Sequence, residues 1–303
     1  MRLPRSRTAV ATLGGLAAAL ALAAATALAP AAHAQSLIQP ESSSSIAGWT
    51  ETGSYLESAL TAGEGVATVD PPGGTPYELY RGVGSVPFAE LIAGWTHIGD
   101  PDSADGYIID NFQGSSSGNS KMFLLTTPSG ATYKYTHTLV SGELYNNSFD
   151  AISPDTRWMV AGTWGTESSL QIFPTPYFNN QTSPTGGTLN LSGYINLSTP
   201  VNDIQGCDFV TATQLICASD DSSESIFANQ FPLIEVTLAA PLDGSTVTGT
   251  VTDLGSIPQS SDCSGTFEPE GVDYDTATGV LRVEITQPSV CEVATTVYEY
   301  QQG

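Results

Sequence analysis

A short pattern recurs four times along this chain, and each copy places an Asp three positions after a polar residue. An apolar run typical of a β-strand opens seven or eight residues after that Asp. The copies are His97-Ile98-Gly99-Asp100, Asn147-Ser148-Phe149-Asp150, Gln205-Gly206-Cys207-Asp208 and Glu270-Gly271-Val272-Asp273. A weaker fifth copy starts at Glu51, because the letters IAGWT stand before Glu51 and again before His97. Such a repeat indicates stacked units that bury a continuous core.

The spacing of the copies and the strand pattern point to one fold class. The first residues of successive copies lie 46, 50, 58 and 65 residues apart, and a four-stranded propeller blade takes about 40–50 residues. Short apolar runs alternate with Gly, Pro, Asn, Asp and Ser, which is typical of all-β proteins. We therefore predict an all-β fold, a β-propeller of about five blades with four antiparallel strands each, around a central channel. A sixth divergent blade and a β-sandwich are the alternatives, although a sandwich would not require this periodicity.

The first 34 residues have the three parts of a secretory signal peptide. Basic residues come first (Arg2, Arg5 and Arg7), an apolar run follows over 9–29, and Ala32-His33-Ala34 is an A-x-A cleavage signature. We predict a signal peptide at 1–34, a mobile N-terminal segment at 35–45 and a single propeller domain at 46–303. A membrane anchor is the alternative, because the apolar run is long enough to span a bilayer.

The chain is strongly acidic, with 31 Asp+Glu against 8 Lys+Arg and a formal charge of -23. Loss of the predicted signal peptide would remove three bases and no acid, which leaves -26. Such a surface favours solubility and attracts cations, whereas binding to a nucleic-acid backbone needs a basic face. We therefore expect a secreted, extracellular monomer that binds no nucleic acid and, after signal cleavage, no membrane.

The four cysteines form an even set, which an oxidising compartment would pair. The segments around Cys207 and Cys217 read as two strands joined by a short turn, and that register would place the two thiols opposite each other. We predict a Cys207–Cys217 disulfide, and Cys263–Cys291 follows by elimination. A zinc site is the alternative, but the spacings are not C-x-x-C and His is scarce.

Polar residues at equivalent places in a propeller should converge, because the innermost strand of each blade runs along the channel. The repeat therefore predicts that Glu51, His97, Asn147, Gln205 and Glu270 surround one end of the axis. Carboxylate and amide oxygens are the ligands that Ca²⁺ prefers, whereas the imidazole of His97 suits a general base. We predict Glu51, Asn147, Gln205 and Glu270 as metal ligands, with His97 and Glu270 as catalytic residues. The alternative is that these side chains only hold neighbouring loops.

The Asp residues that close the four copies have a simpler interpretation. An Asp beside a tight turn accepts local backbone hydrogen bonds. We expect Asp100, Asp150, Asp208 and Asp273 to be structural.

Two segments, EPEGVDYDTATGVLRVEI (268–285) and IQGCDFVTATQLICASDD (204–221), resemble blade openings of secreted calcium propellers such as gluconolactonases and paraoxonase-like esterases. Phytase-like esterase propellers are similar too. The resemblance covers two to four blade openings and is not specific to one family. Gluconolactonase-like propellers hold calcium with acid and amide side chains, so the resemblance implies calcium ligands at Glu270, Gln205 and Asn147, with Glu51 as a weak match and His97 as a departure.

No stringent catalytic motif accompanies the repeat: G-x-S-x-G, H-E-x-x-H, Walker and G-x-G-x-x-G patterns are all missing from the sequence. A catalytic triad would need His97 or His137, and the alternating pattern around His137 predicts a solvent-facing side chain. Trp residues could stack sugars, but three of the four stand at repeat-equivalent or strand positions that predict core packing (the four are Trp49, Trp95, Trp158 and Trp164).

The pattern as a whole predicts an extracellular binding protein with a polar site in the central channel. Its ligand would be a small molecule, a glycan or an extracellular protein, and Ca²⁺ is the expected cofactor. The alternative is a metal-assisted hydrolase of small esters, lactones or sugars.

Overall fold

The computed structural model describes residues 46–303, so the predicted signal peptide and the predicted mobile segment lie outside the described residues. Within 46–303 the chain forms twenty strands, two short α-helices, α1 (Ala59–Ala62) and α2 (Phe88–Ala93), and two 3-10 helices, η1 (Val83–Ser85) and η2 (Ser289–Cys291). None of these helices has the length and apolar character that crossing a bilayer requires. The all-β prediction is confirmed.

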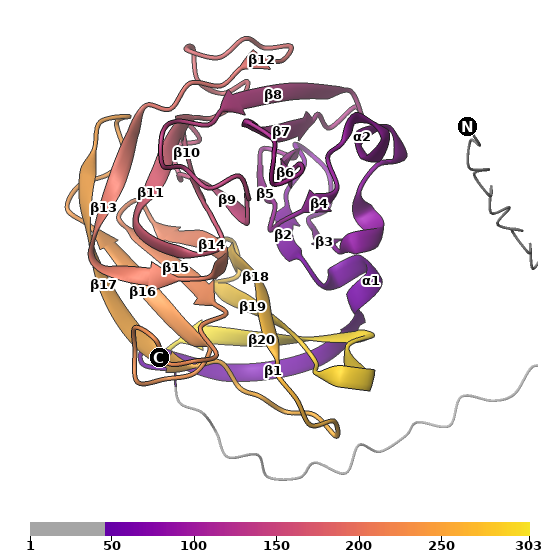
Figure 1. Ribbon diagram of the computed structural model, residues 1–303, viewed down its shortest axis with the longest axis vertical. Helices are drawn as coiled ribbons and strands as arrows, with labels where there is room; N and C mark the ends of the chain where they lie inside the picture. The colour runs from indigo at the N-terminus through magenta and orange to yellow at the C-terminus, as the bar shows by residue number, and fades with distance from the viewer. Residues whose placement is uncertain (1–45) are drawn as a thin grey trace, which may run out of the picture. The chain divides into compact units, whose positions relative to one another are not determined.

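Five inner strands form a closed ring around an axis (Figure 1). They are β2 (Gly65–Val69), β5 (Asp102–Ala104), β9 (Phe149–Ile152), β14 (Ile204–Thr211) and β18 (Glu268–Asp275). Each contacts the next in this order, and β18 contacts β2. Antiparallel strands continue outward from the ring, so the fold is a β-propeller, as predicted.

Three of the inner strands begin four-stranded antiparallel units. The outward orders are β9, β10 (Trp158–Gly162), β11 (Thr166–Pro174), β13 (Gly193–Asn202); β14, β15 (Gln214–Ser219), β16 (Pro232–Leu238), β17 (Val247–Ser256); and β18, β19 (Val280–Thr286), β20 (Ala294–Gln302), β1 (Trp49–Ser58). A parallel pairing of β13 with β17 joins the first two units into one eight-stranded sheet.

The two remaining units are less regular. In one, β5 and the short β4 (His97–Ile98) both pair with β6 (Tyr107–Gln113), followed by β7 (Ser120–Thr126), β8 (Thr132–Thr138) and β12 (Gly187–Thr188). In the other, β2 pairs with β3 (Tyr77–Arg81) alone among the described strands. A unit of two strands departs from the four predicted for every blade, so the number of blades stays a prediction.

The first strand of the described chain belongs to the last sheet. Strand β1 pairs antiparallel with β20, with Trp49 opposite Gln302 and Ser58 opposite Ala294. This pairing closes the ring and places β1 on the outside of its sheet (Figure 1). The first IAGWT copy therefore leads into an outer strand and not into an inner one.

Side chains between adjacent sheets form the core. One cluster joins the β9 and β14 units through residues such as Phe149, Ile172 and Leu215, and another joins the β14 and β18 units through residues such as Ile216 and Leu281. Burial of this apolar surface provides the main driving force for closing the ring.

Both predicted disulfides are confirmed. Cys207 and Cys217 lie directly opposite each other on β14 and β15, with Cα atoms 4.0 Å apart. Cys263 lies in a loop and is joined to Cys291 at the end of a short 3-10 helix (Ser289–Cys291), with Cα atoms 6.0 Å apart. The described part of the chain has no free cysteine, which overturns the zinc alternative.

Glycines allow the inner strands to approach the axis. A β-carbon on Gly206 would lie 2.5 Å from Oδ2 of Asp100, and one on Gly271 would lie 2.6 Å from Cα of Gly65. Such contacts are closer than van der Waals packing allows. The glycine after the first residue of these copies is therefore required by the narrowness of the ring.

Candidate functional site

A cavity of about 720 Å³ lies where the inner strands begin, and we call it the axial pocket. Glu64 lines it from just before β2, Ser148 from just before β9, Gln205 from β14 and Glu270 from β18. Its other lining residues are Ser58, Ala59, Leu60, Gly63, Val83, His97, Gln113, Tyr145, Asn146, Trp164, Glu268, Thr286, Glu292 and Val293. Convergence of strand starts in a ring is what brings these distant segments together.

Three of the five predicted site residues line the axial pocket: His97, Gln205 and Glu270. Asn147 stands between two lining residues, but its side chain is fully buried, and neither amide atom has a hydrogen-bond partner among the described residues. The structure does not bring Glu51 to the axis. It is exposed on the outer strand β1, opposite Tyr300, because β1 completes the last sheet.

Glu64 stands where Glu51 was expected. It lies directly before β2, and its Oε2 atom is 3.2 Å from Nε2 of His97. The sequence holds a signal for it, because Glu64-Gly65-Val66 repeats the letters of Glu270-Gly271-Val272. The other copies have an Asp three residues after the polar residue, whereas Ala67 occupies that position here.

The acids of the axial pocket resist ionisation. Burial raises the pKa of Glu64 to about 8, and the charge of Glu268 adds to the shift. Burial raises the pKa of Glu270 well above its usual value, with further contributions from Glu64 and Glu268. Burial lowers the pKa of His97. Burial therefore favours the uncharged form of both Glu64 and His97.

Unpaired polar atoms and an exposed aromatic ring complete the axial pocket. Asn146 Oδ1 and Ser148 Oγ are buried and have no hydrogen-bond partner among the described residues. Asn146 Nδ2 donates to the carbonyl oxygen of Trp164 at 2.6 Å. Trp164 itself is 51% exposed, whereas Trp49 and Trp158 are buried as predicted.

Carboxylates below the axial pocket hold the inner strands together. Asp208 accepts a hydrogen bond from the backbone N–H of Tyr274 at 2.6 Å, and Asp273 accepts one from Thr68 at 2.6 Å. Asp100 accepts from the backbone N–H groups of Val66 at 2.9 Å and of Val272 at 3.1 Å. These three Asp residues have the structural role we expected, but their bonds cross between sheets as well as acting locally.

Asp150 differs from the other three Asp residues of the repeat. It is fully buried, and neither carboxyl oxygen has a hydrogen-bond partner among the described residues. Burial, followed by the charges of Asp102, Asp110 and Asp100, raises its pKa well above the usual value. A protonated, uncharged Asp150 is consistent with this crowding, because several carboxylates at close range cannot all ionise.

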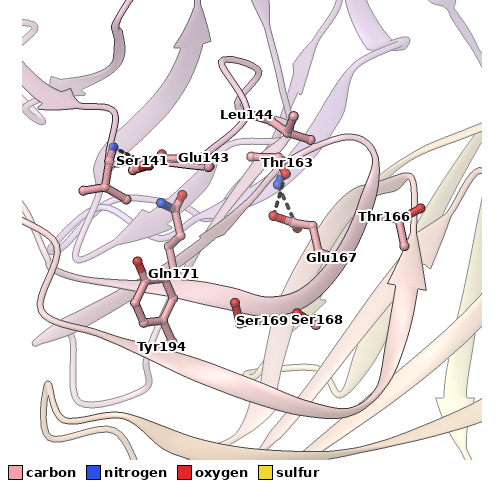
Figure 2. A pocket seen from close by; sticks show the side chains of 12 residues that line it. Ser141, Glu143, Leu144, Thr163, Thr166, Glu167, Ser168, Ser169, Gln171 and Tyr194 are labelled. Carbon is pink, nitrogen blue, oxygen red and sulfur yellow. Dashed lines mark hydrogen bonds between the residues drawn. The ribbon is translucent and has the colours of Figure 1, made fainter.

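A second cavity, of about 290 Å³, lies beside β11 and β13, and we call it the side pocket (Figure 2). Figure 2 shows Gln171 and Tyr194 on one wall, with Glu143 and the Thr163–Glu167 pair on others. Thr163 N donates to Glu167 Oε2 at 3.0 Å. Burial raises the pKa of Glu167 to about 7.

A buried lysine stands behind the side pocket. Lys121 Nζ lies 2.9 Å from Glu143 Oε1 and donates to Gln171 Oε1 at 2.9 Å. His137 Nε2 lies 3.0 Å from Glu143 Oε2, and the ring is buried, so the prediction of a solvent-facing His137 is wrong. Its Nδ1 atom lies 3.1 Å from the carbonyl oxygen of Leu189. Burial alone would raise the pKa of Glu143, but the His137 hydrogen bond and the Lys121 charge lower it to about 2.

The predicted metal ligands do not assemble into one cluster. Across residues 46–303, no group of three or more His, Cys, Asp or Glu side chains is arranged to hold a metal ion. Gln205 and Glu270 share the axial pocket, whereas Asn147 is enclosed beside it and Glu51 lies on an outer strand. Calcium binding stays a prediction.

Comparisons with known proteins give no family. No family model matches the chain, and no curated protein matches it. Among solved structures, the major allergen Mala s 1 of Malassezia sympodialis is 11% identical with a TM-score of 0.40, over 75% of this chain and 62% of the allergen. The arabinanase Arb43A of Bacillus subtilis is 10% identical with a TM-score of 0.43, over 83% and 97%.

A third solved structure is the Cps50 (Swd1) beta-propeller domain of Myceliophteria thermophila. It is 9% identical with a TM-score of 0.31, over 59% of this chain and 45% of that domain. The chain thus spans less than two thirds of the length of the allergen and of the Cps50 domain. At these identities and scores the likenesses assign no activity, and function must be argued from the pockets.

Proposed function

We propose that this chain is an extracellular binding protein whose ligand site is the axial pocket. One observation carries the proposal: the starts of inner strands from several sheets converge on a cavity that contains buried polar atoms without partners in the described chain. A buried polar group without a partner costs free energy, so a protein retains it where something else supplies the bond. A volume of about 720 Å³ suits a small organic ligand.

Export of the chain belongs to the same proposal. Two disulfides fit an oxidising compartment, and the sequence begins with the pattern of a secretory signal. The strong acid excess suits a protein that stays dispersed outside the cell. Expression with the native leader and recovery of a chain starting at Gln35 in the medium would test it.

A thermal-shift screen of small molecules and glycans tests the binding function. Ligands of the axial pocket should raise the melting temperature of the protein, because they bind the native state alone. Their affinity should fall in Gln205→Ala, which changes a lining residue, and persist in Gln230→Ala, which changes an exposed loop residue. Ligands that bind both variants and Trp164→Ala equally well would contradict the assignment of the site.

The second candidate function is a hydrolase, and the Glu64–His97 contact favours it. Burial favours a protonated Glu64 carboxyl group and an unprotonated His97 imidazole, and the two lie 3.2 Å apart, so an acid and a base stand side by side in a cavity. The bound Ca²⁺ that the sequence predicts would polarise a carbonyl group.

Activity panels of lactones, aryl esters and glycosides, with and without calcium, test the hydrolase. We expect Glu64→Gln and His97→Gln each to lower kcat by about a hundredfold or more if this pair is catalytic. Calcium should also raise the melting temperature of the wild type and not of Glu270→Gln. Absence of turnover in every panel would contradict this candidate and leave the binding function standing.

A further inference from the structure

The ionisable side chains that line the axial pocket are mostly acidic. Four glutamates line it, namely Glu64, Glu268, Glu270 and Glu292, and no Lys or Arg of the described chain is among the lining residues. His97 is the one lining side chain that can become cationic, and it already contacts Glu64. These carboxyl groups are uncharged while they hold their protons, and a positive charge brought close to them favours their ionised form.

The polar atoms that lack partners are suited to accept hydrogen bonds. Glu270 lines the same cavity and is only 6% exposed. Asn146 uses its Nδ2 atom on Trp164 and leaves Oδ1 unpaired, and Ser148 Oγ is also unpaired. A ligand that satisfies them must be rich in donors, and an ammonium group has three donors and no acceptor.

The mouth of the axial pocket is apolar. Leu60 on α1, Val83, Val293 and Trp164 all line the cavity, and they are 60%, 63%, 76% and 51% exposed. An exposed apolar group of this kind beside a cavity marks a binding surface. Trp164 also offers an aromatic face, which attracts cations.

We propose that the axial pocket binds an organic cation, with its ammonium group among the buried acceptors and its apolar body against Leu60, Val83, Val293 and Trp164. This inference rests on the proposed binding function and names the ligand class. A bare metal ion fits less well, because the cavity is about 720 Å³ and the described residues offer no cluster of three metal-ligating side chains. A neutral sugar would bring no positive charge that favours ionisation of these acids.

Three matched probes test the charge preference. They are 2-phenylethylamine, its neutral analogue 2-phenylethanol and the anion 3-phenylpropionate, each titrated into the mature protein by calorimetry and Trp fluorescence. We expect the amine to bind at least tenfold more tightly than the alcohol, and the anion not to bind. Equal binding of amine and alcohol overturns the proposal while the pocket remains a binding site, and so does failure of the amine to bind.

Variants locate the amine in the pocket. Glu270→Gln should weaken amine binding at least tenfold, and the exposed Glu292→Gln should weaken it about two- to threefold without risk to the fold. Asp243→Asn is the charge-matched control, because Asp243 is exposed and is not among the residues that line the axial pocket. This variant should bind the amine as the wild type does. Unchanged binding in both glutamate variants overturns the proposal.

A last measurement separates an organic cation from a metal. Displacement of the amine by micromolar Ca²⁺ would show that the acids hold a metal, and it would overturn the proposal. Retention of the amine at millimolar Ca²⁺ supports an organic ligand. Failure of the cation proposal leaves the small-molecule and glycan screen as a separate test of the binding function.

Discussion

Glu143 in the side pocket and Glu64 in the axial pocket are both shielded from solvent, yet their pKa values shift in opposite directions. In the side pocket, Lys121 and His137 contact Glu143, and the pKa of that carboxyl falls to about 2. In the axial pocket, burial dominates, and the pKa of Glu64 rises to about 8. Burial raises the pKa of both carboxyl groups, and at Glu143 the His137 hydrogen bond and the Lys121 charge reverse that shift. Glu167, which also lines the side pocket, behaves as Glu64 does, because burial raises its pKa to about 7.

This contrast separates a structural charge cluster from a site that can accept a ligand. Glu143 is balanced internally, because the buried Lys121 lies 2.9 Å from its carboxyl group. The axial pocket has acids in excess and unpaired acceptors, so its charge can be completed from outside. An internally satisfied cluster gains little from a ligand, whereas an unsatisfied one gains hydrogen bonds and charge balance together.

Removal of the buried lysine should have the largest effect. Lys121→Met leaves Glu143 buried without its cation, and we expect the free energy of unfolding to fall by about 3–5 kcal/mol. Urea denaturation measures it. Lys134→Met is the matched control, because Lys134 pairs with Glu90 at 2.7 Å but is half exposed, and it should cost about 1 kcal/mol or less. Equal losses in the two variants would contradict the buried ion pair.

The pH dependence of stability should distinguish the two pockets next. Glu64 has a folded-state pKa of about 8, above its ordinary value, so the folded protein holds a proton that the unfolded chain releases. The free energy of unfolding therefore falls as pH rises from 5 to 8, by up to about 1.4 kcal/mol per pH unit for one whole proton. Glu64→Gln should flatten part of this slope in a melting series.

Glu143→Gln is the control for that series. Because the folded-state pKa of Glu143 is about 2, its stabilising contribution is present above its ordinary pKa and is lost as pH falls toward 2. The substitution should lower stability near neutrality without changing the slope between pH 5 and 8. A slope unchanged in Glu64→Gln would mean that Glu64 ionises normally.

The smallest effect on stability should come from the mouth of the axial pocket. Trp164→Ala removes an exposed ring and should change the free energy of unfolding by about 0.5 kcal/mol or less. Trp158→Ala, in the buried strand β10, should cost about 3–5 kcal/mol. Chemical denaturation compares them directly, and a large loss in Trp164→Ala would show that this ring supports the fold.

The sequence predicted those features that repeat. The copies that start at Asn147, Gln205 and Glu270 led to β9, β14 and β18, because an inner strand must fit the same narrow ring each time it recurs. The Cys207–Cys217 disulfide followed from strand register, which is a local property of two adjacent segments. His97, Gln205 and Glu270 were placed in one cavity by the same argument.

The repeat could not predict features that depend on closure of the ring or on contacts between segments far apart in the sequence. Glu51 was misplaced because the IAGWT letters repeat, whereas ring closure sends the first copy into the outer strand β1. Lys121 was missed because its partners, Glu143 and Gln171, come from segments that share no spacing rule with it. Lys121, Glu143 and Gln171 come together only after the sheets have packed against each other.

The parallel pairing of β13 with β17 should make one side of the propeller ring stiffer than the other. Backbone hydrogen bonds connect all eight strands from β14 to β9, so this part of the ring should resist deformation as a single sheet. The other sheets are joined by side-chain packing and by single hydrogen bonds such as that from Tyr274 to Asp208, and the described part of the β2 sheet has just two strands. Thermal breathing of the ring should therefore concentrate near β2, beside the α1 segment that carries Leu60. The side of the axial pocket near α1 and β2 is therefore the side most able to move when a ligand enters.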